Sequence, residues 1–374
     1  MANMERKRSL REYILNMETF FKDKKILITG HTGFKGSWLT QILLNWGAKV
    51  SGVSLLPETA PNLFDILKIK GRANSYFYDI RSYYAVVEAI KAEKPEIVFH
   101  LAAQPIVRVS YDDPLKTFST NVMGTSHILQ AMKEAGGVKS AVIITTDKVY
   151  ENKEWIYPYR ENDALGGYDP YSASKAAADI IANSYVQSFF NVADFQKKHD
   201  TLVAIARAGN VIGGGDWAPY RLVPDIVRSI YEKDESVEIR SPHAIRPWEH
   251  VLEPLSGYLM LAQGLFEGKK ELSGAWNFGP DSESFMTVKE LVAGAIKFLE
   301  KGSVDIRLDP DSQKHEAGLL TLDTSKSKTY LGWKPRLKFH ENLEFTFSWY
   351  KNYYEKATNP IEFTNRQIEE FFIK

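Results

Sequence analysis

The chain has 374 residues, and its 47 lysines and arginines balance 47 aspartates and glutamates, so the formal net charge is zero. This balance excludes a general electrostatic attraction to nucleic acid or to an anionic membrane, and any anionic ligand must be met by local groups. The sequence contains no cysteine, which excludes disulfides, thiol nucleophiles and thiolate metal sites and is consistent with a reducing compartment.

The first twenty residues form the first candidate element. Leu10, Tyr13, Ile14 and Met17 recur at helical spacing, which predicts an amphipathic arm that packs on its own subunit or on a neighbour. Charged residues interrupt any apolar signal core, and no later run approaches the roughly 20 apolar residues that span a bilayer. We therefore expect a cytoplasmic protein with neither a membrane nor a nucleic-acid partner.

From residue 21 onward, short runs rich in Val, Ile and Leu alternate with longer amphipathic segments. This alternation predicts a parallel sheet covered by helices on both faces, which is a doubly wound α/β fold of the Rossmann type. The expected strands are Ile26–Ile28, Val50–Val53, Ile97–Leu101, Ala141–Ile144 and Leu202–Ile205. The expected helices are Trp38–Trp46, Tyr83–Ala92, Thr117–Lys133 and Ser172–Phe190.

After about residue 210 the sequence changes to Gly and Pro clusters between shorter elements. The length also exceeds what one hydrophobic core usually supports, so we expect two domains that share a cleft. Residues 21–209 are interpreted as a dinucleotide-binding domain, to which segments around residues 243–270 return. Residues 210–374 are interpreted mainly as a smaller mixed α/β substrate-binding domain, and residues 1–20 as the arm.

The segment KKILITGHTGFKGSWL places a strand directly before Gly30, Gly33 and Gly36, and a helix directly after them. The first glycine permits a tight turn, the second lets the backbone approach a pyrophosphate, and the third permits close helix packing. The amides at the start of the helix then face the anion. Because the spacing is GxxGxxG rather than GxGxxG, the prediction of a dinucleotide site depends on the order of strand, loop and helix.

The choice of dinucleotide is less clear from the residues. Ser54 and Leu55 stand at the end of the second strand, where an acidic residue or a 2′-phosphate-binding arginine is expected. The missing arginine disfavours NADP only mildly. Asp79, after the third strand, could accept a hydrogen bond from an adenine amine, or it could simply cap a helix.

Tyr171 and Lys175 lie four residues apart in GGYDPYSASKAAAD, and so share one face of a helix. A nearby cation favours the phenolate, which turns a tyrosine into a proton acceptor. Tyr168 does not have this spacing. Such pairs are common on solvated helices, so the glycine loop upstream is what supports a catalytic interpretation.

The strand in AVIITTDKVY ends in Thr145, Thr146, Asp147 and Lys148, at the carboxyl edge of the expected sheet, where ligands of open parallel sheets bind. A carboxyl there could protonate a leaving hydroxyl, provided that burial raises its pKa. The alternative is that Thr146 and Asp147 only cap the turn.

Across residues 21–350 the chain resembles the extended short-chain dehydrogenase/reductases, and within them the CDP-glucose 4,6-dehydratases. The glycine loop and the Tyr/Lys pair are typical of the whole superfamily. The longer strings HLAAQPIVRVSYDDPLKTFSTNVMGT, GGGDWA and IRPWEHVLEP are more particular to the sugar nucleotide dehydratases.

The resemblance implies a hydro-lyase whose NAD is regenerated within each turnover. Tyr171, assisted by Lys175 and Thr146, would take the proton of the sugar 4-hydroxyl while hydride leaves C4 for the nicotinamide. Asp147 would protonate the departing 6-hydroxyl once the C5 proton is lost, and the hydride would return to C6. The product would be CDP-4-keto-6-deoxyglucose, an intermediate for deoxysugars of bacterial surface polysaccharides such as lipopolysaccharide O-antigen.

One residue departs from the wider dehydratase pattern. TDP-glucose dehydratases carry Asp-Glu where this chain has Asp147-Lys148, so the usual carboxylate base for C5 is absent. Lys148 could serve if desolvation lowered its pKa. The substitution is typical of the CDP-specific group, so we assign the C5 proton to Lys148.

The resemblance also implies binding roles. The implied cofactor contacts are Gly30, His31, Thr32, Gly33, Phe34, Gly36, Asp79, Ile80, Leu101, Ala102, Ala103, Asn121, Thr145, Tyr171 and Lys175. The implied substrate contacts are Gln104, Arg108, Asn210, Arg221 and Arg246. Guanidinium groups suit a pyrophosphate, although a single arginine is more often a surface ion-pair partner.

The remaining expectations concern metals, histidines and assembly. No spacing suits a metal, and His250 and His315 are expected to have packing or solvent roles. By resemblance, the helices at Thr117–Lys133 and Ser172–Phe190 pair in a homodimer, with a tetramer as the alternative.

Two other functions are compatible with these motifs. A 4-epimerase, or a 4,6-dehydratase of another nucleotide sugar, would share Tyr171, Lys175 and the glycine loop, although an epimerase needs neither Asp147 nor Lys148. A non-catalytic NAD-binding protein is the alternative from a different class.

Overall fold

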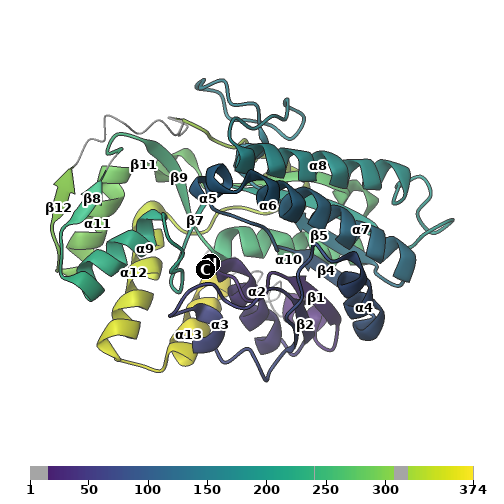
Figure 1. Cartoon of the computed structure of the whole chain (residues 1–374), viewed down its shortest axis with the longest axis horizontal. Coiled ribbons are helices and arrows are strands. Elements are labelled where there is room, and N and C mark those ends of the chain that lie inside the picture. Colours follow the sequence, from purple (N-terminus) through teal and green to yellow (C-terminus); the bar gives the residue numbers. More distant parts are fainter. Residues whose placement is uncertain (1–15, 240, 307–318, 374) are drawn as a thin grey trace, which may run out of the picture.

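The computed structural model describes residues 16–239, 241–306 and 319–373. A central sheet of seven parallel strands runs in the order β10-β6-β5-β4-β1-β2-β3 (Figure 1). The strands are β1 (Lys25–Thr29), β2 (Lys49–Val53), β3 (Asn74–Tyr76), β4 (Ile97–His100), β5 (Ser140–Ile144), β6 (Leu202–Ala208) and β10 (Gly274–Phe278). The prediction of a doubly wound Rossmann-type fold is confirmed.

Helices cover both faces of this sheet. The α-helices labelled in the structure are α2 (Phe34–Asn45), α3 (Leu63–Ile66), α4 (Tyr83–Glu93), α5 (Val107–Asp112), α6 (Pro114–Phe118), α7 (Gly124–Ala135), α8 (Pro170–Ser188), α9 (Leu222–Val227), α10 (Leu252–Phe266), α11 (Val288–Leu299), α12 (Phe339–Glu355) and α13 (Pro360–Ile373). Alternate residues of a strand point to opposite faces. Ile26 and Ile28 of β1 therefore join a core with α2 and α10, whereas Leu27 joins a core with α4, α7 and α8.

The helix expected at Thr117–Lys133 is more irregular than the sequence suggests. It consists of α6 and α7, joined by a π-helical segment at Ser119–Met123. Such segments are often found at functional sites. Here the π-helical segment carries the buried Asn121, which points toward the loop after β4.

The chain beyond residue 209 contributes to the central sheet and also forms two smaller sheets. β7 (Asn210–Ile212), β9 (Ile245–His250) and β11 (Phe285–Thr287) form a three-stranded sheet, and β8 (Val237–Ile239) pairs with β12 (Val304–Ile306). α10 packs on β5 and β6, and β10 extends the large sheet beside β6. The last helix, α13, returns to the central sheet region, where it packs on α2.

Only the end of the expected N-terminal arm lies within the described residues. Residues 16–21 are helical, and Met17 and Phe21 are buried. The Phe21 ring stacks on Trp46 of the same subunit at a centroid distance of 5.8 Å. Leu10, Tyr13, Ile14 and His315 lie outside the described residues. Within the described ranges, no helix combines the length and the apolarity needed to cross a membrane.

Candidate active site

A cavity of about 1630 Å³ opens at the carboxyl edge of the central sheet. Its walls come from the glycine loop, from the ends of β4, β5 and β6, and from residues 209–248. Pockets for a single drug-sized ligand usually hold about 300–1,000 Å³. The cavity is therefore large enough for two ligands side by side.

The glycine loop lies at one end of this cavity and depends on two glycines. Gly30 has a φ of +78°, and a Cβ there would lie 2.7 Å from the Ala102 nitrogen. A Cβ on Gly36 would lie 2.0 Å from the Gly30 carbonyl oxygen. Gly33 precedes α2 without a side-chain cap, and the first turn has no acidic residue. The first amides of α2 are therefore available to an anion, which fits a dinucleotide pyrophosphate.

His31 belongs to the glycine loop, but its side chain does not line the cavity. Its Nε2 is 2.9 Å from the Ser75 hydroxyl, and its ring fills the space where Gly52 lacks a side chain. Burial lowers the pKa of His31 to about 4, so the ring is neutral at pH 7.

Asp79 and Ile80, which follow β3, line the cavity. The two carboxylate oxygens of Asp79 accept hydrogen bonds from the backbone and the side chain of Arg81, and this pairing lowers the pKa of Asp79. Thr32 contacts the Ser54 hydroxyl at 2.7 Å, at the end of β2. The Asp79 carboxylate therefore both lines the cavity and stabilises the turn through Arg81.

Leu101, Ala102 and Ala103 continue the wall, whereas Asn121 lies behind it. The Asn121 amide accepts a hydrogen bond from the Gln104 nitrogen at 2.8 Å and donates to the Ser174 hydroxyl at 2.8 Å. Asn121 thereby ties the loop after β4 to α8.

Tyr171 enters the cavity from the first turn of α8, which begins at Pro170 and is capped by Asp169. Burial raises the pKa of Tyr171 to about 12, even though a hydrogen bond with Thr146 and the positive charge of Arg221 oppose this effect. Both neighbours favour the phenolate, which is the form that can act as a base.

Lys175 lines the same cavity one turn further along α8. Its ammonium donates to the Ile144 carbonyl oxygen at 2.8 Å, and burial lowers its pKa to about 8. The spacing of Tyr171 and Lys175 suggested that Lys175 would be the cation acting on the phenol. In the structure, Arg221 is the cation that lowers the pKa of Tyr171.

Thr145, Thr146, Asp147 and Lys148 follow β5 and all line the cavity. The Thr146 hydroxyl donates to Asp147 Oδ1 at 2.9 Å. Burial raises the pKa of Asp147, although the charges of Lys148 and Arg246 oppose this effect. A buried carboxyl with a raised pKa is a suitable general acid.

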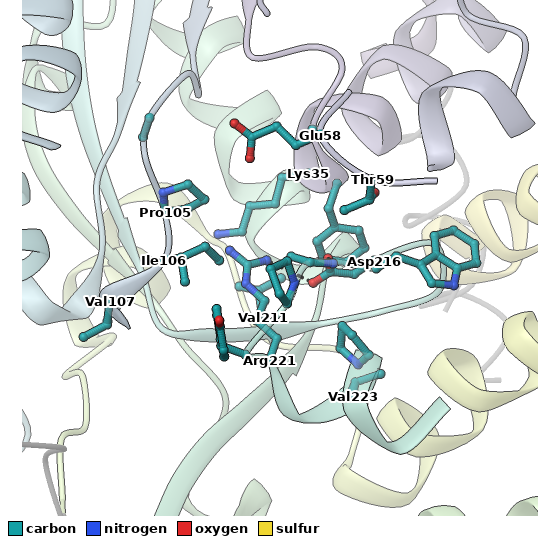
Figure 2. A pocket seen from close by; sticks show the side chains of 18 of the residues that line it. Lys35, Glu58, Thr59, Pro105, Ile106, Val107, Val211, Asp216, Arg221 and Val223 are labelled. Atoms are coloured by element: carbon teal, nitrogen blue, oxygen red, sulfur yellow. Dashed lines mark hydrogen bonds and ion pairs between the residues drawn. The ribbon is translucent and has the colours of Figure 1, made fainter. Parts of the chain in front are cut away.

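The five expected substrate contacts also line the cavity. These are Gln104, Arg108, Asn210, Arg221 and Arg246. The Arg108 guanidinium lies 5.4 Å from the centroid of the Tyr220 ring, and Arg221 Nη1 lies 2.9 Å from Asp216 Oδ2. Figure 2 shows Arg221 and Lys35 pointing into the same space.

The sequence-based prediction missed Lys35 and Glu249. Lys35 lines the cavity from the first turn of α2, between Gly33 and Gly36, and burial lowers its pKa to about 8. A lysine inside a loop that approaches a pyrophosphate is an available sequence signal.

His250, next to Glu249, packs edge-on against Trp38 and Phe345. The described residues contain no cluster of three or more His, Asp or Glu side chains that could hold a metal ion.

Comparisons with known proteins identify the family. The family model described as GDP-mannose 4,6 dehydratase matches residues 27–346, so the chain belongs to this family of nucleotide-sugar dehydratases. A CDP-glucose 4,6-dehydratase of Salmonella typhimurium is 46% identical over 354 residues, which cover 95% of this chain and 98% of the relative. A probable dTDP-glucose 4,6-dehydratase of Sinorhizobium fredii is 26% identical over 87% of this chain and 92% of the relative.

A solved UDP-glucose 4-epimerase of Thermotoga maritima superposes with a TM-score of 0.73 at 22% identity. The match covers 88% of this chain and 99% of the epimerase. At this identity the likeness supports the fold and does not distinguish an epimerase from a dehydratase.

Proposed function

We propose that the protein is an NAD-dependent 4,6-dehydratase that converts CDP-glucose to CDP-4-keto-6-deoxyglucose with loss of water. The observation that carries the proposal is the 46% identity to the Salmonella CDP-glucose 4,6-dehydratase over nearly the full length of both chains. The cavity supports it, because Tyr171 and Asp147 line one cavity and both contact Thr146.

The glycine loop and the uncapped start of α2 would hold the pyrophosphate of NAD, with Lys175 and Leu101 further along the wall. When bound, NAD supplies the hydride acceptor for C4 of the sugar and the donor for C6. Arg221 and Arg246 would bind the pyrophosphate of the CDP-sugar, because a guanidinium offers paired donors to phosphate oxygens.

The acid and base roles follow from the environments of the side chains. Tyr171, next to Thr146 and Arg221, would take the proton of the 4-hydroxyl. Asp147 retains its proton to a higher pH than an exposed aspartate, so it would protonate the departing 6-hydroxyl. Lys148 lines the cavity beside Asp147, and we keep it as the base for the C5 proton.

The test uses CDP-glucose deuterated at C4, with mass spectrometry and NMR of the product. The proposal expects loss of one water and the label at C6. Recovery of CDP-galactose would instead establish an epimerase, and no conversion of CDP, TDP or GDP sugars would favour a non-catalytic NAD-binding protein. Tyr171→Phe should abolish turnover while NAD binding persists, and a fully active variant would remove Tyr171 from the mechanism.

We also infer a homodimer that pairs through α6, α7 and α8 in the cytoplasm. Exposed apolar side chains gather on these helices and on the segment that joins α6 to α7: Leu115, Phe118, Met123 and Ile180. Leu115 is 81% exposed, and a patch of exposed apolar side chains is typical of a protein–protein contact. Light scattering should show a dimer for the wild-type protein and a monomer for Ile180→Glu. An assembly that Ile180→Glu leaves intact would show that the subunits pair through another surface.

A further inference from the structure

The ion pair between Arg221 and Asp216 is fixed on the side of the aspartate. Arg221 directly precedes α9 and lines the cavity with Tyr171, and its Nη1 lies 2.9 Å from Asp216 Oδ2 (Figure 2). The other carboxylate oxygen, Oδ1, accepts a hydrogen bond from the Ala218 nitrogen at 2.9 Å. Both oxygens of Asp216 therefore have partners, and turning the carboxylate away from the guanidinium would break both contacts.

Tyr350 of α12 holds the backbone of Asp216. Its hydroxyl donates to the Asp216 carbonyl oxygen at 2.6 Å and accepts from the Asp216 nitrogen at 3.0 Å. The Tyr350 side chain is fully buried, and its ring packs edge-on against Trp217 at a centroid distance of 5.7 Å. One hydroxyl therefore satisfies both backbone polar groups of a residue that lies in a loop.

The loop that carries Asp216 is also held by its neighbours in the core. The Trp38 indole of α2 donates from Nε1 to the Gly214 carbonyl oxygen at 2.9 Å. A Cβ on Gly214 would lie 2.1 Å from Trp349 Cγ, so α12 approaches this backbone directly. The position of Asp216 is therefore set by two packed helices and not by the loop alone.

The Arg221 guanidinium keeps donors for a ligand. A guanidinium carries five N–H groups in one plane, and within the described ranges the hydrogen bond of Arg221 is the one from Nη1 to Asp216. The positive charge of Arg221 acts on the Tyr171 phenol, and the phenol acts on Arg221 in return. Asp216 thus holds one corner of the guanidinium and leaves its other donors to a phosphate group.

We propose that Asp216, held by Tyr350, is the positioning residue that keeps the Arg221 guanidinium beside both the Tyr171 phenol and the pyrophosphate of the substrate. Paired donation to a phosphate requires a fixed guanidinium plane, and an arginine that is already ordered loses less conformational entropy on binding. The inference rests on the proposed function, in which Arg221 binds the substrate and Tyr171 is the base.

A different role for Asp216 predicts the opposite result. If the aspartate only neutralised Arg221, Asp216→Asn would expose the full positive charge to the phenol and to the substrate. The pKa of Tyr171 would then fall, and the diphosphate would bind more tightly. If Asp216 positions Arg221, the displaced charge acts less on both partners, so the pKa of Tyr171 rises and binding weakens.

The experiment measures Asp216→Asn in two assays at saturating NAD. Calorimetry with CDP as the probe reports the affinity of the substrate site without turnover. The Kd should rise about fivefold, as expected when one long side chain must be ordered on binding. The absorbance of reduced nicotinamide in single turnovers of CDP-glucose gives the pH profile of C4 oxidation. Its acidic limb should move to higher pH by about half a unit, because the base must be deprotonated to act.

Tyr350→Phe tests the same role without changing a charge. It removes the hydroxyl that holds Asp216, so both quantities should shift in the same direction as in Asp216→Asn and by less. Tyr354→Phe is the matched control, because its hydroxyl also belongs to α12 but accepts from the Trp217 indole at 3.1 Å. The control should change neither quantity. The other titratable groups that face the phenol stay unchanged in all of these variants: Asp147, Asp169 and Tyr258.

A double variant shows whether Asp216 acts through Arg221. Arg221→Gln alone should weaken CDP binding and raise the acidic limb. Adding Asp216→Asn should then change neither quantity further, because the effects of two residues that act through one contact are not additive. A purely structural role for Asp216 would instead add its full effect to that of Arg221→Gln.

The inference is overturned if Asp216→Asn tightens CDP binding, leaves both quantities in place, or adds fully to Arg221→Gln. If Asp216→Asn does not fold, Tyr350→Phe decides, and wild-type values in that variant overturn the inference. Failure of the proposed function looks different, because the wild-type protein would then neither bind CDP nor reduce NAD on mixing with CDP-glucose.

Discussion

Arg207 of β6 and Asp179 of α8 form a two-point ion pair in which Nε–Oδ2 and Nη2–Oδ1 are both 2.8 Å apart. The side chains are 3% and 2% exposed. Thr145, at the end of β5, donates to the same carboxylate at 3.1 Å. The pair therefore fastens the helix that carries Tyr171 to the strand ends that carry the acid.

Removing Asp179 should be costly, because it leaves a buried guanidinium without its counter-charge. Asp179→Ala is expected to lower the free energy of unfolding by about 3–5 kcal/mol. Asp194→Ala is the control, since its ion pair with Lys198 is exposed and should contribute less than about 1 kcal/mol. Urea denaturation measures both, and equal losses would show that the buried pair has no special role.

Gly36 and Gly33 of the phosphate loop should respond differently to alanine. Gly36→Ala forces a Cβ to 2.0 Å from the Gly30 oxygen, so both stability and NAD affinity should fall. Gly33→Ala meets its nearest atom at 3.4 Å, so the fold should persist. If the backbone at Gly33 approaches a pyrophosphate, NAD affinity should still fall about tenfold or more. Calorimetry and thermal melting separate the two effects, and unchanged NAD affinity in Gly36→Ala would place the dinucleotide elsewhere.

The sequence predicted elements well where one local pattern decides them. β1, β4, β5 and β6 are short apolar runs buried on both faces, and each was found within a few residues of its predicted bounds. β3, with the sequence NSY, and β10, with GAWNF, carry no such run. They become strands because they pair with β2 and β6, which is a tertiary effect that a local pattern does not contain.

The site shows the same division. The motif residues Tyr171, Lys175 and Asp147 could be predicted to meet, because the carboxyl ends of parallel strands share one edge. The charge of Arg221 acts on the phenol, and that of Lys35 acts on Glu249, across segments more than 40 residues apart in the chain. No spacing rule connects such segments, so only the folded chain reveals these charges.

Arg221 should control both substrate binding and the pKa of Tyr171. Its positive charge lowers that pKa, so Arg221→Gln should raise it and move the acidic limb of C4 oxidation to higher pH, because the base must be deprotonated to act. Loss of a charge-assisted contact should also raise the KM for CDP-glucose about tenfold or more. The pH profile is followed by the absorbance of reduced nicotinamide in single turnovers.

Arg228→Gln is the control for this prediction, because Arg228 pairs with Asp225 in the same region of the chain. An acidic limb that stays in place in Arg221→Gln, or moves equally in Arg228→Gln, would contradict the role of Arg221 at the phenol.

His100, at the end of β4, should make the fold sensitive to acid. It is 2% exposed, and its ring nitrogens contact the hydroxyls of Thr29 at 2.6 Å and Thr125 at 3.0 Å. Burial lowers its pKa from an unfolded value near 6.5 to about 3. Between these values the unfolded chain binds a proton that the folded chain does not, so stability falls as the pH drops below about 6.5.

The linkage predicts that His100 alone removes about 2 kcal/mol of stability between neutral pH and about pH 5. His100→Gln can still bond both threonines but does not titrate, so its unfolding free energy should fall by about that much less over the same window. Glu253, whose pKa burial raises to about 7, gains stability as the pH falls, but it is common to both proteins and cancels in the comparison. Urea denaturation at the two pH values measures the difference, with the same change at the exposed His243 as the control. Equal losses in wild type and His100→Gln would mean that His100 accepts a proton in the folded protein.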